Sequence, residues 1–483
     1  MNTVERALLE RVARQAMLDY GFEPEFSAAA RAQAEALEPA AAANGVRDMR
    51  DRPWSSIDNP ESRDLDQIEF VEATAGGTRL YVGIADVAAT VAAGSPIDAH
   101  AAANTTSVYT GVHTYTMLPA SLSFDRTSLV QDEERPVIVV QVDVDGEGQL
   151  HGAEVYRALA VNQAKLNYPA ISAWLAGGLP PPAVCQTAAL QEQLRLQDEL
   201  AERLARARKA AGSLDFETAE ARPVLDEHGD VVGLEPHRQD RAGAIIEEFM
   251  IAANRAVVGA LDRAGLPSIL RVVRTPEQWD RIVEYAAGLG GDLPEQPDER
   301  ALSEFLDRMR RERAAEFHEI SLAIVKLIGR GEYVAHKPGD KPVGHFGLAL
   351  EAYGHATAPN RRFADLATQR LLAPLLDGAK PPYELEDVQA IAQNCSAMER
   401  QADKVERRVR KSIAAALLSH RIGQAFQGVV TKAQPDATYV HIFHPPAEGM
   451  VVRGERGLRV GAKVHVRLLR VDVERSLIDF AAG

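Results

Sequence analysis

The stretch Ser56-Ile-Asp-Asn-Pro-Glu-Ser-Arg-Asp-Leu-Asp-Gln67 places three carboxylates, Asp58, Asp64 and Asp66, within nine residues. If the segment is extended, Asp64 and Asp66 point to one face, because side chains alternate along a strand. A loop that returned Asp58 toward them would concentrate negative charge, which a buried site tolerates only with a cation. Carboxylate oxygens suit Mg or Mn. A solvated acidic turn is the alternative interpretation, since Asp is usually exposed.

The segment after this acidic stretch, Arg79–Ala88, has the apolar content of a buried strand, so the carboxylates lie beside a sheet. From Arg47 onward the pattern is that of an α+β protein. Strands are predicted at Ile68–Glu72, Thr78–Val87, Val137–Val144, Glu154–Val161 and Val231–Leu234. Helices are predicted at Ala188–Ala211, Ala242–Ala264, Pro276–Leu289, Ala301–Ile328 (one or two helices), Ala364–Leu376 and Leu385–Phe426 (with one break).

Residues 1–46 form a separate compositional unit, predicted to be a small helical domain with one helix over Val4–Tyr20 and a second capped by Ser27. Two short helices are compatible with a helix-turn-helix module. The segment holds seven acidic residues against four arginines, however, which is a poor composition for binding DNA phosphates. A docking or capping element is the alternative.

After Gln427 the pattern changes from helical to strand-like, and residues 423–483 are predicted to form a separate domain. Its five short strands are Gly428–Thr431, Thr438–Phe443, Gly449–Arg453, Lys463–Val471 and Leu477–Phe480. Five antiparallel strands are the content of an OB-fold β-barrel, a common binder of single-stranded nucleic acid. A barrel without a ligand is the alternative, and the alternating basic residues of the fourth strand favour RNA binding.

Composition sets further limits. A chain of 483 residues has room for roughly three domains, here 1–46, 47–422 and 423–483. The net charge of −15 argues against a protein that coats nucleic acid indiscriminately. No apolar run is long enough to cross a bilayer, and the N-terminus lacks the apolar core of a signal peptide. With only two cysteines, far apart, we expect no disulfide framework and a cytoplasmic location.

Motifs along the chain follow one order. They are Arg47–Arg50, the acidic stretch, Ile84–Val87, Thr106–Tyr109, Met117–Leu122, Ala164–Tyr168, Ile246–Asn254, His345–Tyr353 and Thr357–Asp365. Each is weak alone, but in this order they resemble the ribonuclease II (RNB) family of exoribonucleases across most of residues 47–483. The resemblance implies an RNB catalytic domain, followed by an OB-fold domain of the ribosomal-protein type. It also implies hydrolysis of single-stranded RNA from the 3′ end, with release of nucleoside 5′-monophosphates.

The resemblance also implies roles for individual residues. A metal site for Mg, with Mn as the other candidate, would be formed by Asp58, Asp64, Asp66 and Gln67. Catalysis would depend on Asp66, Asp64 and Arg361, with the Arg361 guanidinium against phosphate oxygens. RNA would be bound by Tyr109, Tyr168, Phe216, Glu247, Arg362 and Glu406, with Tyr109 and Phe216 bracketing stacked bases. Each role has an alternative interpretation when the residue is taken alone. The aromatic residues would then belong to the core, and Arg361 and Arg362 would be a solvated pair. Glu406 would be an i,i+4 partner of Arg410 on one helix.

Three departures from the family pattern qualify these expectations. Gln67 stands where relatives usually have a fourth Asp, so the metal site is expected to be weaker or to prefer Mn. Ala358-Pro-Asn360 replaces a Ser-Pro-Ile sequence. Residues 1–46 are too few for the cold-shock barrels of many relatives, so we expect easier access for structured RNA. We expect a monomer that acts on single-stranded or 3′-tailed RNA.

Two rival functions remain open from the sequence. The first is an RNA-binding or adaptor protein of the same fold with a weakened metal site, which Gln67 favours. The second is a DNA-regulatory protein that uses residues 1–46, which the acidic balance of that segment disfavours. Retention of Asp58, Asp64, Asp66 and Arg361 favours the enzyme over both.

Overall fold

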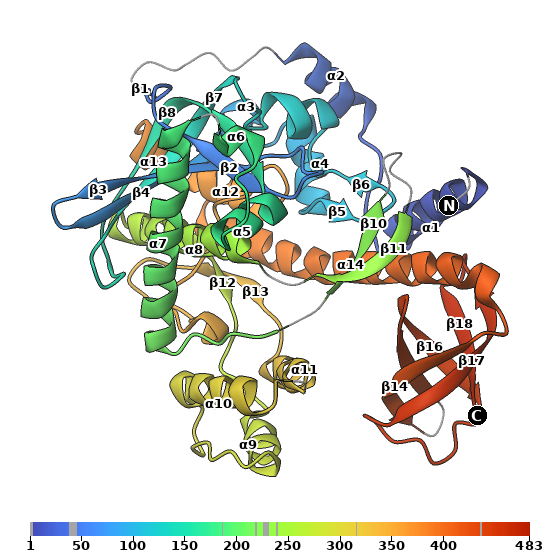
Figure 1. Cartoon of the computed structure of the whole chain (residues 1–483). Helices are drawn as coiled ribbons and strands as arrows, with labels where there is room; N and C mark the ends of the chain where they lie inside the picture. Colours follow the sequence, from blue (N-terminus) through green and yellow to red (C-terminus); the bar gives the residue numbers. More distant parts are fainter. Residues whose placement is uncertain are drawn as a thin grey trace.

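A computed structural model describes residues 3–37, 46–185, 187–217, 220–225, 231–237, 240–314, 316–434 and 437–483. In these residues the chain forms an α+β body, a helical lobe and a C-terminal barrel at the end of one long helix (Figure 1). The predicted fold class, α+β with an OB-type barrel at the C-terminus, is confirmed. No helix in the described ranges is both long enough and apolar enough to cross a membrane.

A central sheet organises the α+β body. Its order is β1-β8-β7-β4-β3-β2-β9, with antiparallel pairs in the middle and parallel pairs, β1 with β8 and β2 with β9, near the edges. The strands are β1 (Arg47–Asp48), β2 (Ser55–Asp58), β3 (Gln67–Thr74), β4 (Gly77–Ala85), β7 (Glu134–Val144), β8 (Leu150–Val161) and β9 (Ala164–Asn167). Strand β4 is buried on both faces, which explains its continuous apolar sequence. The acidic stretch begins in β2 and ends where β3 starts.

Helices α7 (Ala188–Ala211) and α8 (Arg241–Arg263) cover the sheet, with α8 along β7 and β8 and α7 against β3. Helix α7 is amphipathic, since Leu194, Leu200 and Leu204 are buried and its charged residues are mostly exposed. It ends at Gly212, whose φ of +104° is a left-handed conformation that favours glycine. The predicted bounds of α7 are therefore confirmed.

A helical lobe projects from the body on a two-stranded ribbon that the sequence did not predict, β12 (Ser268–Val272) with β13 (Glu332–His336). Its helices are α9 (Trp279–Gly288), α10 (Glu299–Glu312) and α11 (Phe317–Ile328), which share their own apolar core. The segment Ala301–Ile328 thus forms two helices. The ribbon strands are only five residues long and lie between strong helical patterns, which obscure a period of two.

Helix α14 (Leu385–Leu418) runs from the body to the barrel as one continuous helix of 34 residues (Figure 1). The predicted break was wrong, because the helix contains neither Gly nor Pro and a capping box at Glu384 and Asp387 fixes its start. Its predicted end at Phe426 was also wrong. The helix stops at Leu418, and Phe426 already lies in the first barrel strand, where it is buried.

The barrel is closed in the order β14-β15-β16-β18-β17. Its strands are β14 (Ala425–Gln434), β15 (Ala437–Phe443), β16 (Pro446–Arg453), β17 (Lys463–Asp472) and β18 (Leu477–Ala482). The predicted strands are confirmed, but not all pairs are antiparallel, because β16 and β18 run parallel where they close the barrel. Closure leaves no free sheet edge, and the interior is filled by side chains such as Phe480.

The N-terminal helices pack in two different places. Helix α1 (Thr3–Asp19) lies against α14, where Leu9 and Met17 join its apolar core and Asp19 accepts a hydrogen bond from Arg408 at 2.6 Å. Helix α2 (Ala28–Ala36) packs on α4, and its predicted cap is confirmed, since Ser27 accepts from the Ala30 amide.

The remaining elements are α3 (Val87–Thr90), α4 (Pro96–Asn104), β5 (Val108–Tyr109), β6 (Thr114–Tyr115), η1 (Leu122–Arg126), α5 (Tyr168–Leu175), α6 (Pro182–Cys185), β10 (Glu220–Leu225), β11 (Val231–His237), η2 (Phe346–Leu348), α12 (Phe363–Leu371), α13 (Ala373–Leu376) and η3 (Ser419–Arg421).

Candidate active site

The acidic stretch forms the end of β2 and the loop that leads into β3. Asp58, the last residue of β2, accepts hydrogen bonds from the Asn59 amide at 2.9 Å and from the Ser62 hydroxyl at 2.7 Å. The loop it begins therefore orients its carboxylate. Burial raises the pKa of Asp58, and the nearby charge of Asp64 raises it further. The expected return of the loop, which brings Asp58 into electrostatic contact with Asp64, is thus present.

Asp66 is the most buried of the three carboxylates, with 1% of its surface exposed. Its Oδ1 accepts a hydrogen bond from the Asn360 amide at 2.9 Å. Its Oδ2 has no hydrogen-bond donor among the described residues, and the Arg361 Nε lies 3.4 Å away. Burial raises the pKa of Asp66 to about 7, while Arg361 and the Asn360 amide oppose the increase. The buried carboxylate thus retains one oxygen that the polypeptide does not satisfy.

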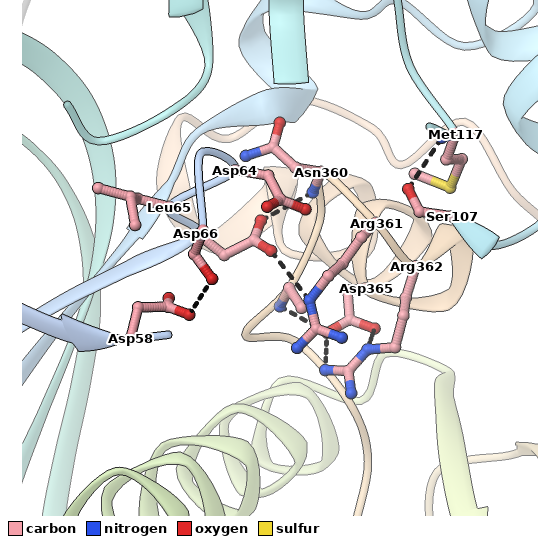
Figure 2. A network of polar contacts seen from close by, with 12 residues as sticks. Asp58, Asp64, Leu65, Asp66, Ser107, Met117, Asn360, Arg361, Arg362 and Asp365 are labelled. Atoms are coloured by element: carbon pink, nitrogen blue, oxygen red, sulfur yellow. Dashed lines mark hydrogen bonds and ion pairs between the residues drawn. The ribbon is translucent and has the colours of Figure 1, made fainter. Parts of the chain in front are cut away.

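Asp64, like Asp58, is half-buried, and its Oδ2 accepts a hydrogen bond from the Tyr109 hydroxyl at 2.5 Å. Tyr109, on β5, is 42% exposed, and its amide donates to Glu406 on α14 at 3.2 Å. Burial of the hydroxyl raises the pKa of Tyr109, so the phenol remains a donor at neutral pH. Figure 2 shows Asp58, Asp64 and Asp66 around the loop, with Arg361 approaching Asp66.

No three His, Cys, Asp or Glu side chains in the described ranges already converge as a ready-formed metal cage. The three carboxylates are instead held separately by Ser62, Tyr109 and the Asn360 amide. The structure therefore brings the three carboxylates close to one another, but their oxygens do not converge as a preformed metal site.

Arg361 and Arg362 are adjacent in sequence but are held differently. Arg362 donates two hydrogen bonds to the fully buried Asp365, at 2.8 and 2.6 Å, and this pair fixes the loop before α12. The Arg361 side chain is 43% exposed and faces Asp66 (Figure 2). The Arg361 backbone is fixed by the Ser107 amide, which donates to its carbonyl at 3.0 Å. Of the two arginines, Arg361 therefore has the more exposed side chain.

The other predicted residues lie on several elements. Tyr168 is the first residue of α5, and burial together with the charges of Asp58 and Glu69 raises its pKa. Gln67 is the first residue of β3 and is buried. Phe216 packs at the edge of the helical-lobe core, and Glu247 on α8 lies 3.4 Å from the Arg208 guanidinium. Tyr168 thus lies near Asp58, and Gln67 follows Asp66 directly in the chain, whereas Phe216 packs in the helical lobe and Glu247 lies beside Arg208.

Two residues of the site were missed by the sequence analysis. Asn360 is fully buried, accepts from the Thr127 hydroxyl at 2.5 Å and donates to the Thr127 carbonyl at 3.0 Å. The Asn360 side chain, which departs from the family pattern, therefore pairs with Thr127, while its backbone amide donates a hydrogen bond to Asp66. Glu69, also fully buried, lies two residues after Gln67 on β3, and burial followed by the charge of Asp58 raises its pKa well above the ordinary value. The signal in the sequence that could have identified Glu69 was an acidic residue two positions after Gln67.

Carboxylates at the end of a sheet strand and a partly exposed arginine beside them lie in an α+β body, which a long helix joins to a closed five-stranded OB-type barrel. The RNB domain matches residues 46–378, and the RNase II-type exonuclease C-terminal S1 domain matches residues 424–483. The chain belongs to the RNB-domain family. The predicted resemblance is therefore confirmed.

Similar proteins support this assignment. Ribonuclease R of Aquifex aeolicus is 30% identical over 462 residues, which cover 90% of this chain and 64% of the relative. The chain thus spans less than two thirds of that relative's length. The solved structure of Mycoplasma genitalium RNase R with ribose-methylated single-stranded RNA is 22% identical, with a TM-score of 0.87 over 98% of this chain and 77% of the other. The solved structure of Mycoplasma genitalium RNase R with double-stranded RNA is 22% identical, with a TM-score of 0.84; the match covers 98% of this chain and 82% of the other.

Proposed function

We propose that this protein is a metal-dependent exoribonuclease that shortens RNA from its 3′ end and releases nucleoside 5′-monophosphates. The observation that carries the proposal is the unsatisfied Asp66 oxygen, buried beside the exposed Arg361 and the carboxylates of Asp58 and Asp64. Buried charge of one sign without a full set of partners is unfavourable in an ordinary core. The 3′ polarity and the product follow the family resemblance.

The donor set fits a hard divalent cation. Asp58, Asp64 and Asp66 offer carboxylate oxygens, and Gln67 offers an amide oxygen. We propose that these four residues hold Mg, with Mn as the alternative because the amide brings no charge. When bound, such a cation lowers the pKa of a water and neutralises charge on a phosphate.

The residues of the chain itself would bind and orient the RNA. Arg361, whose side chain is 43% exposed, would bind phosphate oxygens. Tyr109 offers an exposed ring on which a terminal base can stack without sequence preference. We further propose RNA-binding roles for Tyr168, Phe216, Glu247, Arg362 and Glu406; Arg362 would act chiefly by fixing the loop that carries Arg361.

The barrel supports RNA as the substrate. On β17 the exposed residues Lys463, His465 and Arg467 alternate with the inward-facing Val466 and Leu468. A basic outer face on a closed five-stranded barrel suits a single-stranded backbone. We propose that the protein acts as a monomer in the cytoplasm on single-stranded or 3′-tailed RNA. Its two cysteines are free thiols, which is compatible with the reducing compartment that we propose.

The test is a degradation assay with 5′-labelled single-stranded RNA and Mg or Mn. Wild type is expected to give a descending ladder, and Asp66→Asn is expected to give none. Asp51→Asn is the matched control, because Asp51 is 83% exposed and pairs only loosely with Arg52 at 3.7 Å. Intact RNA after incubation of wild type with either metal would exclude the enzyme.

The second candidate is an RNA-binding or adaptor protein, which Gln67 favours because it removes one negative charge from the donor set. This candidate predicts that the protein binds the labelled RNA in a filter assay and leaves its length unchanged. Under that outcome, Gln67→Asp would be expected to create Mg-dependent shortening. In the enzyme, the same substitution is expected to retain or improve activity with Mg.

A further inference from the structure

Residues 213–217 follow the end of α7 and carry Phe216. Their contacts are with the helical lobe. The Ser213 carbonyl accepts a hydrogen bond from the Ser303 hydroxyl of α10 at 2.9 Å, and the Leu214 side chain is buried in the apolar core of the lobe. The Phe216 ring packs at the edge of the same core and is half-buried, so part of it stays accessible. The segment therefore belongs to the lobe by its contacts, although it follows a helix of the body in sequence.

Both neighbours of Phe216 are bonded to helices of the lobe. On one side, the Arg310 guanidinium of α10 donates to the Asp215 carboxylate and, at 3.1 Å, to the Asp215 carbonyl. On the other side, the Glu217 carbonyl accepts a hydrogen bond from Nδ1 of His318, on α11, at 2.9 Å. The backbone is therefore held before and after Phe216, which limits the directions in which its ring can point.

Arg310 joins this segment to both helices. Its guanidinium lies 4.6 Å from the centre of the Phe317 ring, which is fully buried at the start of α11. The planar guanidinium donates to two oxygens of Asp215 at once, a geometry that a lysine could not reproduce. The side chains of Arg310 and Asp215 are 40% and 51% exposed, and ion pairs this exposed add little to stability. The contact therefore fixes the course of the segment more than it stabilises the lobe.

We propose that Arg310 is a positioning residue, which acts through Asp215 to hold Phe216 where its ring stacks on an RNA base. Stacking requires an aromatic face at a fixed place, and each stacked base contributes about tenfold or more in affinity. Arg310 acts on the RNA only through the ring. The helical lobe thereby becomes part of the RNA-binding apparatus, because α10 carries the side chain that orients Phe216. This inference rests on the proposed function, because it requires Phe216 to stack on RNA.

The test measures binding of single-stranded RNA in a filter assay with EDTA, so that affinity is read without cleavage. Arg310→Gln removes a positive charge and Asp215→Ala removes a negative one, yet both break the same contact. Positioning predicts that each weakens binding by about threefold or more, part of the loss of a full stacking contact. Charge alone predicts opposite effects, since loss of an acidic residue favours binding to phosphates. Both residues are half-exposed, so the variants are expected to fold.

Arg311→Gln is the matched control, because it removes the same charge from the next, exposed position of α10. Its affinity is expected to stay within about twofold of wild type, since salt screens a single exposed charge. Phe216→Ala is expected to weaken binding by about tenfold. Adding Arg310→Gln to Phe216→Ala is expected to cause no further loss, because the two residues act as one unit. With Mg or Mn, Arg310→Gln is expected to raise KM more than it lowers kcat, as loss of a ground-state contact does.

The outcomes separate this inference from the proposed function. If Phe216→Ala weakens binding while Arg310→Gln and Asp215→Ala bind as wild type does, the positioning role is wrong and the enzyme stands. Tighter binding by Asp215→Ala, or a further loss in the double variant, would also overturn it.

A lower melting temperature together with a fall in kcat would reduce the pair to a structural contact. If wild type neither binds nor shortens RNA, both proposals fall. Weaker binding by both single variants, with no further loss in the double variant, supports Arg310 as the residue that positions Phe216.

Discussion

Replacing Asp66 by Asn is expected to stabilise the metal-free protein while it abolishes activity. The pKa of Asp66 rises from 3.8 to about 7 on folding, chiefly because the carboxyl is buried. Below pH 3.8 the group is protonated in both states and adds nothing. As pH rises toward 7, the unfolded chain ionises and the folded chain does not, so the free energy of unfolding falls. Above pH 7 the full cost is roughly 4 kcal/mol, and Asn keeps the shape without it.

The assay is urea denaturation in EDTA at pH 5 and pH 8. It is followed by tryptophan fluorescence, to which the buried Trp54 of the same sheet contributes. The stability advantage of Asp66→Asn over wild type is expected to grow from about 1.5 kcal/mol at pH 5 to about 4 kcal/mol at pH 8. Asp51→Asn should follow wild type at both pH values. An Asp66→Asn protein that is less stable than wild type at pH 8, or equally stable at both, would refute the electrostatic argument.

Three further substitutions test single contacts. Tyr109→Ala is expected to weaken single-stranded RNA binding by about 1–3 kcal/mol in a filter assay, while Tyr109→Phe keeps the stacking surface and most of the affinity. Arg362→Lys breaks the paired hydrogen bonds to buried Asp365 and should lower the free energy of unfolding by about 1–3 kcal/mol; an unchanged melting curve would contradict this. Asn360→Ala leaves the Thr127 carbonyl without its donor and should cost a similar amount in the same melting assay, against an unchanged Asp51→Asn control.

The elements predicted well from the sequence are those with a clear local pattern of apolar residues and clear end signals. Helix α7 was predicted with its observed bounds because its apolar spacing and terminal Gly212 are local signals. The five barrel strands were found for the same reason. The parallel pairing of β16 with β18 was missed, because strand direction at the point of closure depends on contacts between distant segments. The break predicted in α14 shows that an alanine-rich, charged pattern without Gly or Pro gives no ground for an interruption.

The candidate site was predicted as a set of residues but not as a set of contacts. Asp66 was named, yet its partner, the Asn360 amide, is 294 residues away in sequence. Tyr109 was expected to stack with RNA, and its hydrogen bond to Asp64 could not be foreseen from either local pattern. The burial of Glu69 likewise depends on packing between distant segments, such as helix α7 against β3, and from the sequence alone an acidic residue in a strand is expected to be exposed.

The most direct test of the central claim is the identity of the first product released from RNA by wild type with Mg or Mn. The substrate is a single-stranded RNA labelled only in the phosphate that joins its last two nucleotides. A 3′-end exoribonuclease that leaves 5′-monophosphates must release this label at once as a nucleoside 5′-monophosphate, resolved by thin-layer chromatography. Label that first appears in an oligonucleotide, or that stays in full-length RNA, would contradict the account.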